Sequence, residues 1–161
     1  MDEIQRMQDN LRLIRRAVGW TAEEFGNQIG VTRQTINNLE SGHNRLTKTQ
    51  YIAMRSVLDA EMAKYPEETE MLKTILEVFV DHPDNYKMED RENLKAKANL
   101  VTPSILAGTA SRKNVSKEWM QAAASLGVAV MAGIVAGPIG VGSLASAWLM
   151  KIAAGAGKKK K

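Results

Sequence analysis

A run of polar side chains near residue 35 has the composition of a surface that reads DNA bases. Residues 33–38 are Arg, Gln, Thr, Ile, Asn and Asn, so that Ile36 is the only apolar member. Arginine pairs well with the edge of guanine, glutamine and asparagine pair with adenine, and a threonine methyl group contacts thymine. A helix face that is merely solvated more often carries Glu and Lys. The run therefore indicates side chains that contact base edges.

Signals for helix starts and stops lie on both sides of this run. Thr21 and Glu24 have the spacing of a capping box, and Gly30 can take the left-handed conformation that ends a helix. Thr32 is the expected cap of the next helix, whose inward edge begins at Ile36. The apolar pairs that accompany the two caps are Trp20 with Phe25 and Val31 with Ile36. These signals predict two short helices joined by a tight turn, with the polar run on the second helix.

The stretch resembles the helix-turn-helix domains of the lambda-repressor-like family, also called XRE. The resemblance covers residues 11–59 and is carried by Gly30-Val31-Thr32, by the run at 33–38 and by Leu39-Glu40-Ser41-Gly42. It implies a domain over residues 1–65 that binds double-stranded DNA. The residues that it implies as base contacts are Arg33, Gln34, Thr35 and Asn38.

The resemblance also implies contacts to the phosphate backbone and one structural pair. In the family, an arginine at the place of Arg15 pairs with a glutamate at the place of Glu40, which steadies the arginine near the DNA. Ala22 departs from the pattern, because the family often has a phosphate-contacting glutamine there. For the loop after Gly42, an ordinary polar turn is an equal alternative. The residues expected to contact phosphate are Arg15, Thr21, Thr32, Asn37, Ser41, Asn44, Arg45 and Lys48.

Helical spacing predicts the other elements of this domain. A first helix is expected to end at Gly19, with the apolar stripe Met7, Leu11, Ile14 and Val18. Thr47 and Gln50 form another capping box, which opens a helix that runs to about Ala63. Family members usually bind as dimers on half-sites about 34 Å apart, so self-association is expected from a segment outside residues 1–65. The resemblance thus implies a homodimer or a higher homo-oligomer.

An acidic helical segment is predicted over residues 66–99, with Pro66 at its first helical position. Its apolar positions follow helical spacing: Leu72, Ile75, Leu76 and Phe79. That face packs either on the DNA-binding domain or on a second copy, which makes the segment a candidate for dimerisation. Residues 81–85 are expected as a turn, residues 88–99 as an exposed helix or linker, and residues 100–118 as a basic linker.

The formal net charge of +4 is distributed unevenly along the 161 residues. Residues 1–65 hold nine basic and eight acidic side chains, whereas residues 99–161 hold eight basic and one acidic. The basic excess therefore lies in the C-terminal part, and the expectation of DNA binding depends on the motif alone. The chain has no cysteine, and its two histidines, His43 and His82, have no metal-ligand spacing. No catalytic, metal or cofactor site is expected, and an enzyme is disfavoured.

The most apolar stretch is residues 119–150, which carry no charge. Lysines and an arginine flank it, Trp119 and Trp148 lie near its ends, and Pro138 interrupts it. Residues 119–157 are predicted to form an apolar, Gly/Ala-rich helical hairpin, followed by the lysine tail 158–161. The tail suits anionic lipid or a nonspecific contact to nucleic acid, and an engineered solubility tail is a further alternative.

Three interpretations of that stretch remain open. The hairpin inserts into a membrane, a single helix over residues 122–145 spans it, or the segment forms a soluble core shared with a second subunit. Membrane association in one of the first two forms is favoured. A hairpin keeps both basic flanks and the DNA-binding domain on the cytoplasmic side, whereas a single crossing would send the lysine tail outward. The charged residues 1–20 do not fit a signal peptide.

Together these observations predict an all-α protein with an N-terminal helix-turn-helix domain of four to five helices, a helical middle segment and the C-terminal hairpin. We expect a sequence-specific, repressor-like transcriptional regulator of bacterial or phage type. It is expected in the cytoplasm, at the inner face of the membrane if the hairpin inserts. The alternative is a membrane-active or self-assembling protein in which the helix-turn-helix is an accessory module that tethers DNA.

Overall fold

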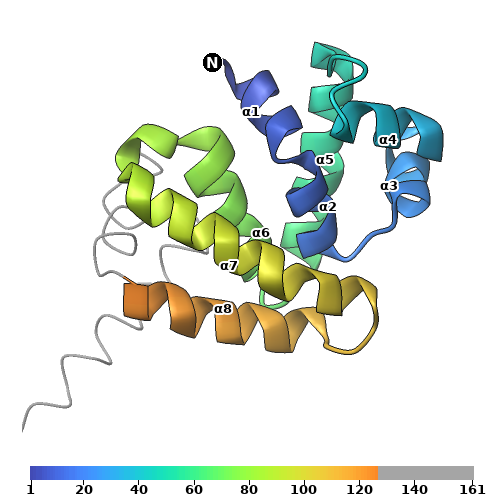
Figure 1. The fold of residues 1–161 in the computed structure, drawn as a ribbon. Helices are drawn as coiled ribbons and strands as arrows, with labels where there is room; N and C mark the ends of the chain where they lie inside the picture. Colours follow the sequence, from blue (N-terminus) through green and yellow to red (C-terminus); the bar gives the residue numbers. More distant parts are fainter. Residues whose placement is uncertain (127–161) are drawn as a thin grey trace, which may run out of the picture.

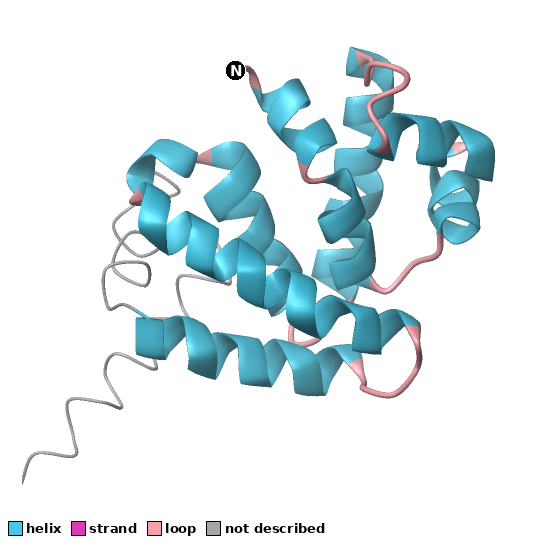
Figure 2. Ribbon diagram, in the orientation of Figure 1, coloured by secondary structure: helices cyan, strands magenta, loops and turns pink. Residues whose placement is uncertain are grey.

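The computed structural model describes residues 1–126, with side chains described up to residue 121. Every regular element in this part of the chain is helical, which confirms the all-α prediction (Figure 2). The elements are α1 (Glu3–Asp9), α2 (Leu11–Val18), α3 (Ala22–Ile29), α4 (Arg33–Glu40), α5 (Lys48–Lys64), α6 (Glu70–Ile75), the π-helix η1 (Leu76–Asp81), the 3-10 turn η2 (Pro83–Asn85), α7 (Met88–Leu106) and α8 (Arg112–Leu126).

The predicted first helix is divided in two at Asn10. The Asn10 side chain donates to the carbonyl of Arg6 at 2.8 Å, and its φ of −109° lies outside the helical range. Asparagine competes in this way for backbone groups and weakens a helix interior. The apolar stripe survives the break, because every member of it is at most 1% exposed: Met7, Leu11, Ile14 and Val18.

The local start and stop signals form as the sequence predicts. Thr21 and Glu24 make a reciprocal capping box at the start of α3, and Thr47 and Gln50 make another at the start of α5. Gly30 ends α3 in the left-handed region with φ +78°. These contacts satisfy the backbone N–H groups that a helix start leaves without partners.

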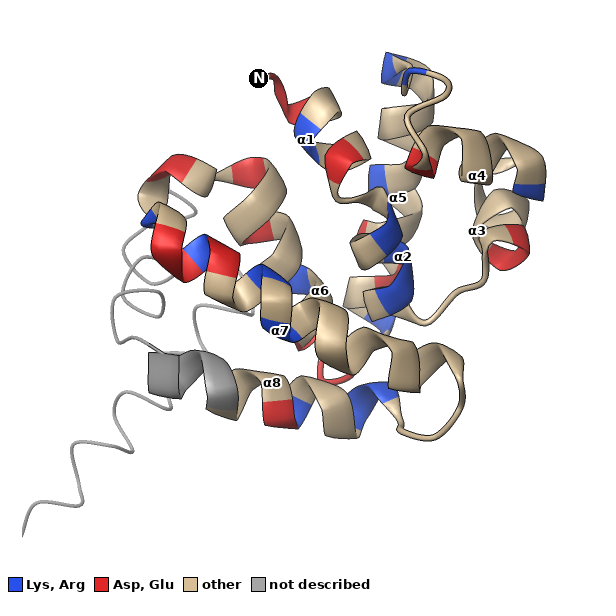
Figure 3. Cartoon of the chain, viewed as in Figure 1, with Lys and Arg blue, Asp and Glu red and all other residues tan. Residues whose placement is uncertain are grey.

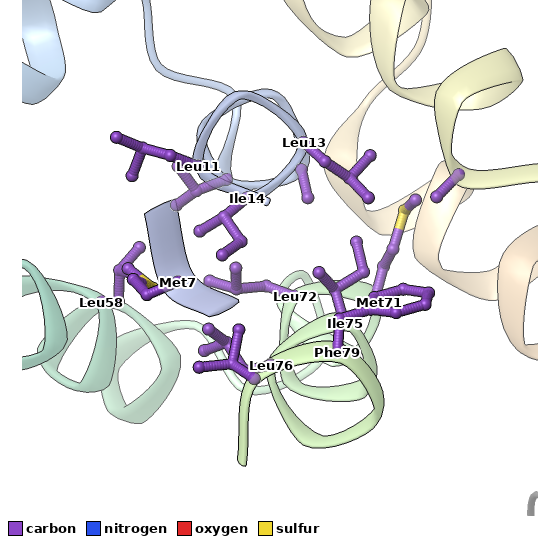
Figure 4. Close-up of a cluster of buried hydrophobic side chains, with 14 of the residues drawn as sticks. Met7, Leu11, Leu13, Ile14, Leu58, Met71, Leu72, Ile75, Leu76 and Phe79 are labelled. Carbon is purple, nitrogen blue, oxygen red and sulfur yellow. The ribbon is translucent and has the colours of Figure 1, made fainter. Parts of the chain in front are cut away.

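The middle segment packs onto the N-terminal domain. Figure 4 shows side chains from α6 and η1 meeting those of α1, α2 and α5 in one apolar cluster. Of the two alternatives expected for this apolar face, packing on the DNA-binding domain is the one observed, and Leu72 and Ile75 are 0% exposed. The helix begins at Glu70, four residues later than Pro66, because residues 66–69 form turns.

The expected basic linker over residues 100–118 is helical instead. α7 continues to Leu106, with Pro103 inside it, and α8 begins at Arg112. α7 packs against α2 and α8, and α8 packs against α6 (Figure 1). One side of α7 is buried at Leu94, Ala98 and Thr102, which recur every four residues. Because these buried positions recur at helical spacing between charged residues, α7 has one side that packs on the rest of the protein.

Trp119, the first residue of the predicted apolar hairpin, packs in the core of the helical unit. Its side chain is 2% exposed, which corrects the predicted start of the hairpin. α8 is thus part of the helical unit, and the rest of the predicted hairpin, with Trp148 and the lysine tail, lies outside the described residues. Within residues 1–126, no helix is both long and apolar enough to cross a membrane.

Candidate nucleic-acid interface

The turn between α3 and α4 depends on two glycines. Gly30 takes positive φ, and a Cβ added there would meet no atom within 4 Å. A Cβ on Gly26 would instead lie 2.6 Å from the backbone oxygen of Val31. Glycine at position 26 therefore lets the α3 backbone lie close to Val31 and Thr32, the residues that lead into α4. The sequence did not point us to Gly26, although glycine inside a helix is a recognised sign of close backbone approach.

Helix α4 turns its polar run outward. Ile36 and Leu39 are buried at 0% and 1% exposure, while Arg33 and Gln34 are exposed. Thr35, Asn37 and Asn38 are half-buried. The four residues predicted to contact bases therefore all remain at least partly accessible, on the parts of α4 that are not occupied by Ile36 and Leu39. Helix α4 lies away from α7 and α8, which pack on α2 and α6 (Figure 1).

Hydrogen bonds order the exposed face of α4 before any partner is bound. The Thr32 hydroxyl caps α4 by accepting from the backbone N–H of Thr35 at 3.1 Å. The Gln34 side-chain amide donates to the side-chain oxygen of Asn38 at 3.0 Å. Two amide side chains are thus held together one helical turn apart, at the spacing where residues on a helix are neighbours.

Arg15 of α2 and Glu40, the last residue of α4, form a buried ion pair. Two guanidinium nitrogens of Arg15 donate to the two carboxylate oxygens of Glu40, and a third donates to the carbonyl of Trp20 at 2.9 Å. The side chains are only 10% and 2% exposed. The predicted structural pair of Arg15 with Glu40 is thus present, and only a small part of the Arg15 side chain is accessible. The side chain of the nearby Arg12 is 56% exposed, and its Nε lies 3.4 Å from a carboxylate oxygen of Glu40. An accessible cation therefore lies beside the buried pair.

The loop after α4 carries the remaining predicted phosphate contacts. Ser41, Asn44 and Arg45 are exposed, as is Lys48 in the first turn of α5. Thr21 and Thr32 are exposed at the starts of α3 and α4. These polar groups thus lie at the starts of α3, α4 and α5 and in the loop between α4 and α5. This arrangement would allow contacts to the backbone on either side of a groove.

Charges of both signs are spread over the described unit (Figure 3). Basic residues lie along α2, at the start of α4 and around the loop before α5, and others lie on α7 and α8. Acidic residues are dense around η1 and the start of α7, and others lie on α1, on α3 and at the end of α4. The assignment of the interface therefore depends on the side chains of α4 and not on the overall charge. Residues 1–126 contain no cluster of His, Cys, Asp and Glu that could hold a metal ion.

Comparison with known proteins identifies the N-terminal part. Residues 11–64 match the family model described as helix-turn-helix. The match spans α2 to α5, which are the elements that form the turn and its support. Neither the curated proteins nor the solved structures contain a match to the chain. Residues 11–64 are thus a helix-turn-helix domain of the lambda-repressor-like (XRE) family, a family of DNA-binding regulators.

Proposed function

We propose that the protein is a sequence-specific, repressor-like transcriptional regulator whose helix α4 enters the major groove of DNA. The observation that carries the proposal is the orientation of α4. Its apolar edge at Ile36 and Leu39 is buried, and its opposite face presents side chains that match base edges. Base recognition is assigned to Arg33, Gln34, Thr35 and Asn38.

Contacts to phosphate would fix the register of the domain on the duplex. They are assigned to exposed groups around α4, because such contacts orient a protein without reading sequence. Arg12, the more exposed cation, is assigned such a contact beside Arg15, and Arg15 also anchors the end of α4 through Glu40. The other assigned residues are Thr21, Thr32, Asn37, Ser41, Asn44, Arg45 and Lys48.

Selection from a random pool of DNA duplexes tests this function. The full chain is expected to enrich one short sequence, and Gln34→Ala should relax the preference at one position and weaken binding by about 1–3 kcal/mol. Gln121→Ala is the matched control, because this glutamine is exposed on α8, outside the helix-turn-helix. Enrichment of no sequence, or an unchanged preference in Gln34→Ala, would contradict the role of α4.

Self-association or membrane anchoring is assigned to the C-terminal segment after residue 126. Two observations support this assignment. The apolar face of α6 and η1 is used inside the chain and is not available for a second copy. Residues 119–150 are uncharged, and most of them lie in this segment. A dimer formed through that segment would place two α4 helices on two half-sites.

A further inference from the structure

The side chain of Gln8 joins α1 to the end of helix α4 and to the loop that follows it. Its amide nitrogen donates to the carbonyl of Leu39 at 2.9 Å and to the carbonyl of Asn44 at 2.6 Å. Its amide oxygen accepts from the backbone N–H of Leu46 at 2.9 Å. Two acceptors face the nitrogen and one donor faces the oxygen, which fixes the orientation of the amide. Gln8 is 7% exposed, so water has little access to these bonds.

The three backbone groups bound by Gln8 lie at positions that matter for contacts to DNA. Leu39 is in the last turn of α4, where helix carbonyls have no partners within the helix. Asn44 and Leu46 flank Arg45, and Lys48 follows two residues later at the start of α5. Gln8 therefore holds the far part of this loop against the helix assigned to base recognition, beside two backbone bonds, from Gly42 N–H to the Leu39 carbonyl and from Asn44 N–H to the Asn38 carbonyl. Its removal would leave the Asn44 carbonyl and the Leu46 N–H without the partner that Gln8 supplies, which would favour another conformation of the loop between them.

Gln8 lies outside the part of the chain that matches the helix-turn-helix family model, residues 11–64. The helix that carries it is held by contacts of its own. The Tyr51 hydroxyl donates to Glu3, and the Arg6 guanidinium donates to the carbonyl of Val80 at 2.7 Å. α1 is thus tied to α5 and to η1, and Gln8 extends from a supported element to the loop.

We infer that Gln8 is a positioning residue for DNA binding, which holds the loop at residues 41–47 so that Arg45 and Lys48 meet the phosphate backbone. This inference rests on the proposed function. The partner is the phosphate backbone of double-stranded DNA, and Gln8 acts on it only through the loop. Because the loop groups contact phosphate and not bases, Gln8 governs affinity and its salt dependence, whereas the base preference belongs to α4.

Isosteric replacement of Gln8 in the full chain tests the inference. Gln8→Met keeps the length of the side chain and removes all three hydrogen bonds. Gln8→Glu keeps the acceptor for Leu46 but places a carboxylate oxygen against the carbonyls of Leu39 and Asn44. The matched control is Gln5→Met on the same helix, because the Gln5 amide bonds only to the exposed Asp9 side chain. The probe is the duplex selected by the wild-type chain from a random pool.

Two measurements are made on each variant. Amide hydrogen exchange without DNA reports whether the Leu46 N–H has lost its partner, which is expected in Gln8→Met and not in Gln5→Met. Binding over a range of salt concentrations reports the phosphate contacts. Both Gln8 variants are expected to bind about tenfold more weakly, with a salt slope smaller by about one unit and an unchanged base preference.

A salt slope equal to that of the wild type would overturn the inference, even if affinity fell, because the loop would then keep its phosphate contacts. Unchanged exchange at Leu46 in a folded Gln8→Met would overturn it as well. If Gln8→Met does not fold, the same measurement of the salt slope on Gln8→Glu tests the inference. Failure of the wild-type chain to select any duplex would remove the proposed function and this inference together, and the exchange measurement would still show whether Gln8 orders the loop.

Discussion

Arg112 at the start of α8 donates to Glu61 of α5 at 2.6 Å, which ties the C-terminal helices to the last helix of the DNA-binding domain. The same guanidinium donates to Glu68 at 2.8 Å and to the carbonyl of Val18 at 3.0 Å. Burial acts to lower the pKa of Arg112, but the hydrogen bonds to Glu61 and Glu68 outweigh it and raise the pKa above its usual value. The residue therefore stays protonated, and α8 is held to the helix-turn-helix domain by charge as well as by apolar packing.

Replacing Arg112 with alanine is expected to destabilise the whole described unit. The side chains of Arg112 and Glu61 are each 17% exposed, so the loss should be about 2 kcal/mol, less than for a fully buried pair. Lys113→Ala is the matched control, because its pair with Glu67 is 65% and 74% exposed and should contribute less than about 0.5 kcal/mol. Urea unfolding measures the free energy of unfolding of both variants and of the wild type. Equal effects of the two variants would show that α8 is not held through Arg112.

The ion pair between Arg15 and Glu40 gives a second expectation. Glu40→Ala leaves the guanidinium of Arg15 in a site where its side chain is 10% exposed, and it should lower the free energy of unfolding by about 3 kcal/mol. Replacing both partners by apolar residues, Arg15→Met with Glu40→Leu, should restore most of that stability, because no buried charge then lacks a partner. Arg12→Ala should have little effect, since Arg12 is 56% exposed. A double variant as unstable as Glu40→Ala would contradict this account.

Gly26 and Gly30 are expected to respond to substitution for different reasons. Gly26→Ala gains up to about 1 kcal/mol of helix propensity, but its Cβ would lie 2.6 Å from the oxygen of Val31. Overpacking of this kind typically costs about 1–3 kcal/mol, so the net change should be a loss of stability and of DNA affinity together. Gly30→Asn should be nearly neutral, because asparagine tolerates the left-handed conformation and the site is open. Thermal unfolding and duplex binding compare the two, and a Gly26→Ala variant as stable as the wild type would show that the α3–α4 approach can relax.

The features that the sequence predicted well are those that depend on neighbours within a few residues. The caps at Thr21 and Thr47 and the stop at Gly30 form as expected, because a capping box or a positive φ involves only the adjacent turn. The long-range features could not be predicted in this way. Arg112 contacts Glu61 across 51 positions of the sequence, and no local pattern marks that pair.

Trp119 shows why the C-terminal boundary was misplaced. A tryptophan between a basic stretch and an apolar one suits the edge of a membrane, and it suits the last buried turn of a packed helix equally well. Only the packing of α8 against α6 and α7 distinguishes a tryptophan in a packed helix from one at the edge of a membrane. The same packing places Val115 and Met120 in the core, at 4% and 7% exposure.

The boundary at residue 126 determines how the C-terminal segment should be tested. A chain that ends after Asn99 would cut α7 and remove Arg112 and Trp119, and we expect it to aggregate for that reason alone. A chain that ends after Leu126 keeps every described helix. Compared with the full chain, it should no longer float with anionic lipid vesicles, or should form a smaller assembly in solution, or both. It should also bind DNA more weakly, since a monomer holds one half-site. If the two chains have the same assembly size and neither floats, the last 35 residues neither anchor nor assemble the protein, and any dimer would have to form through the surface of residues 1–126.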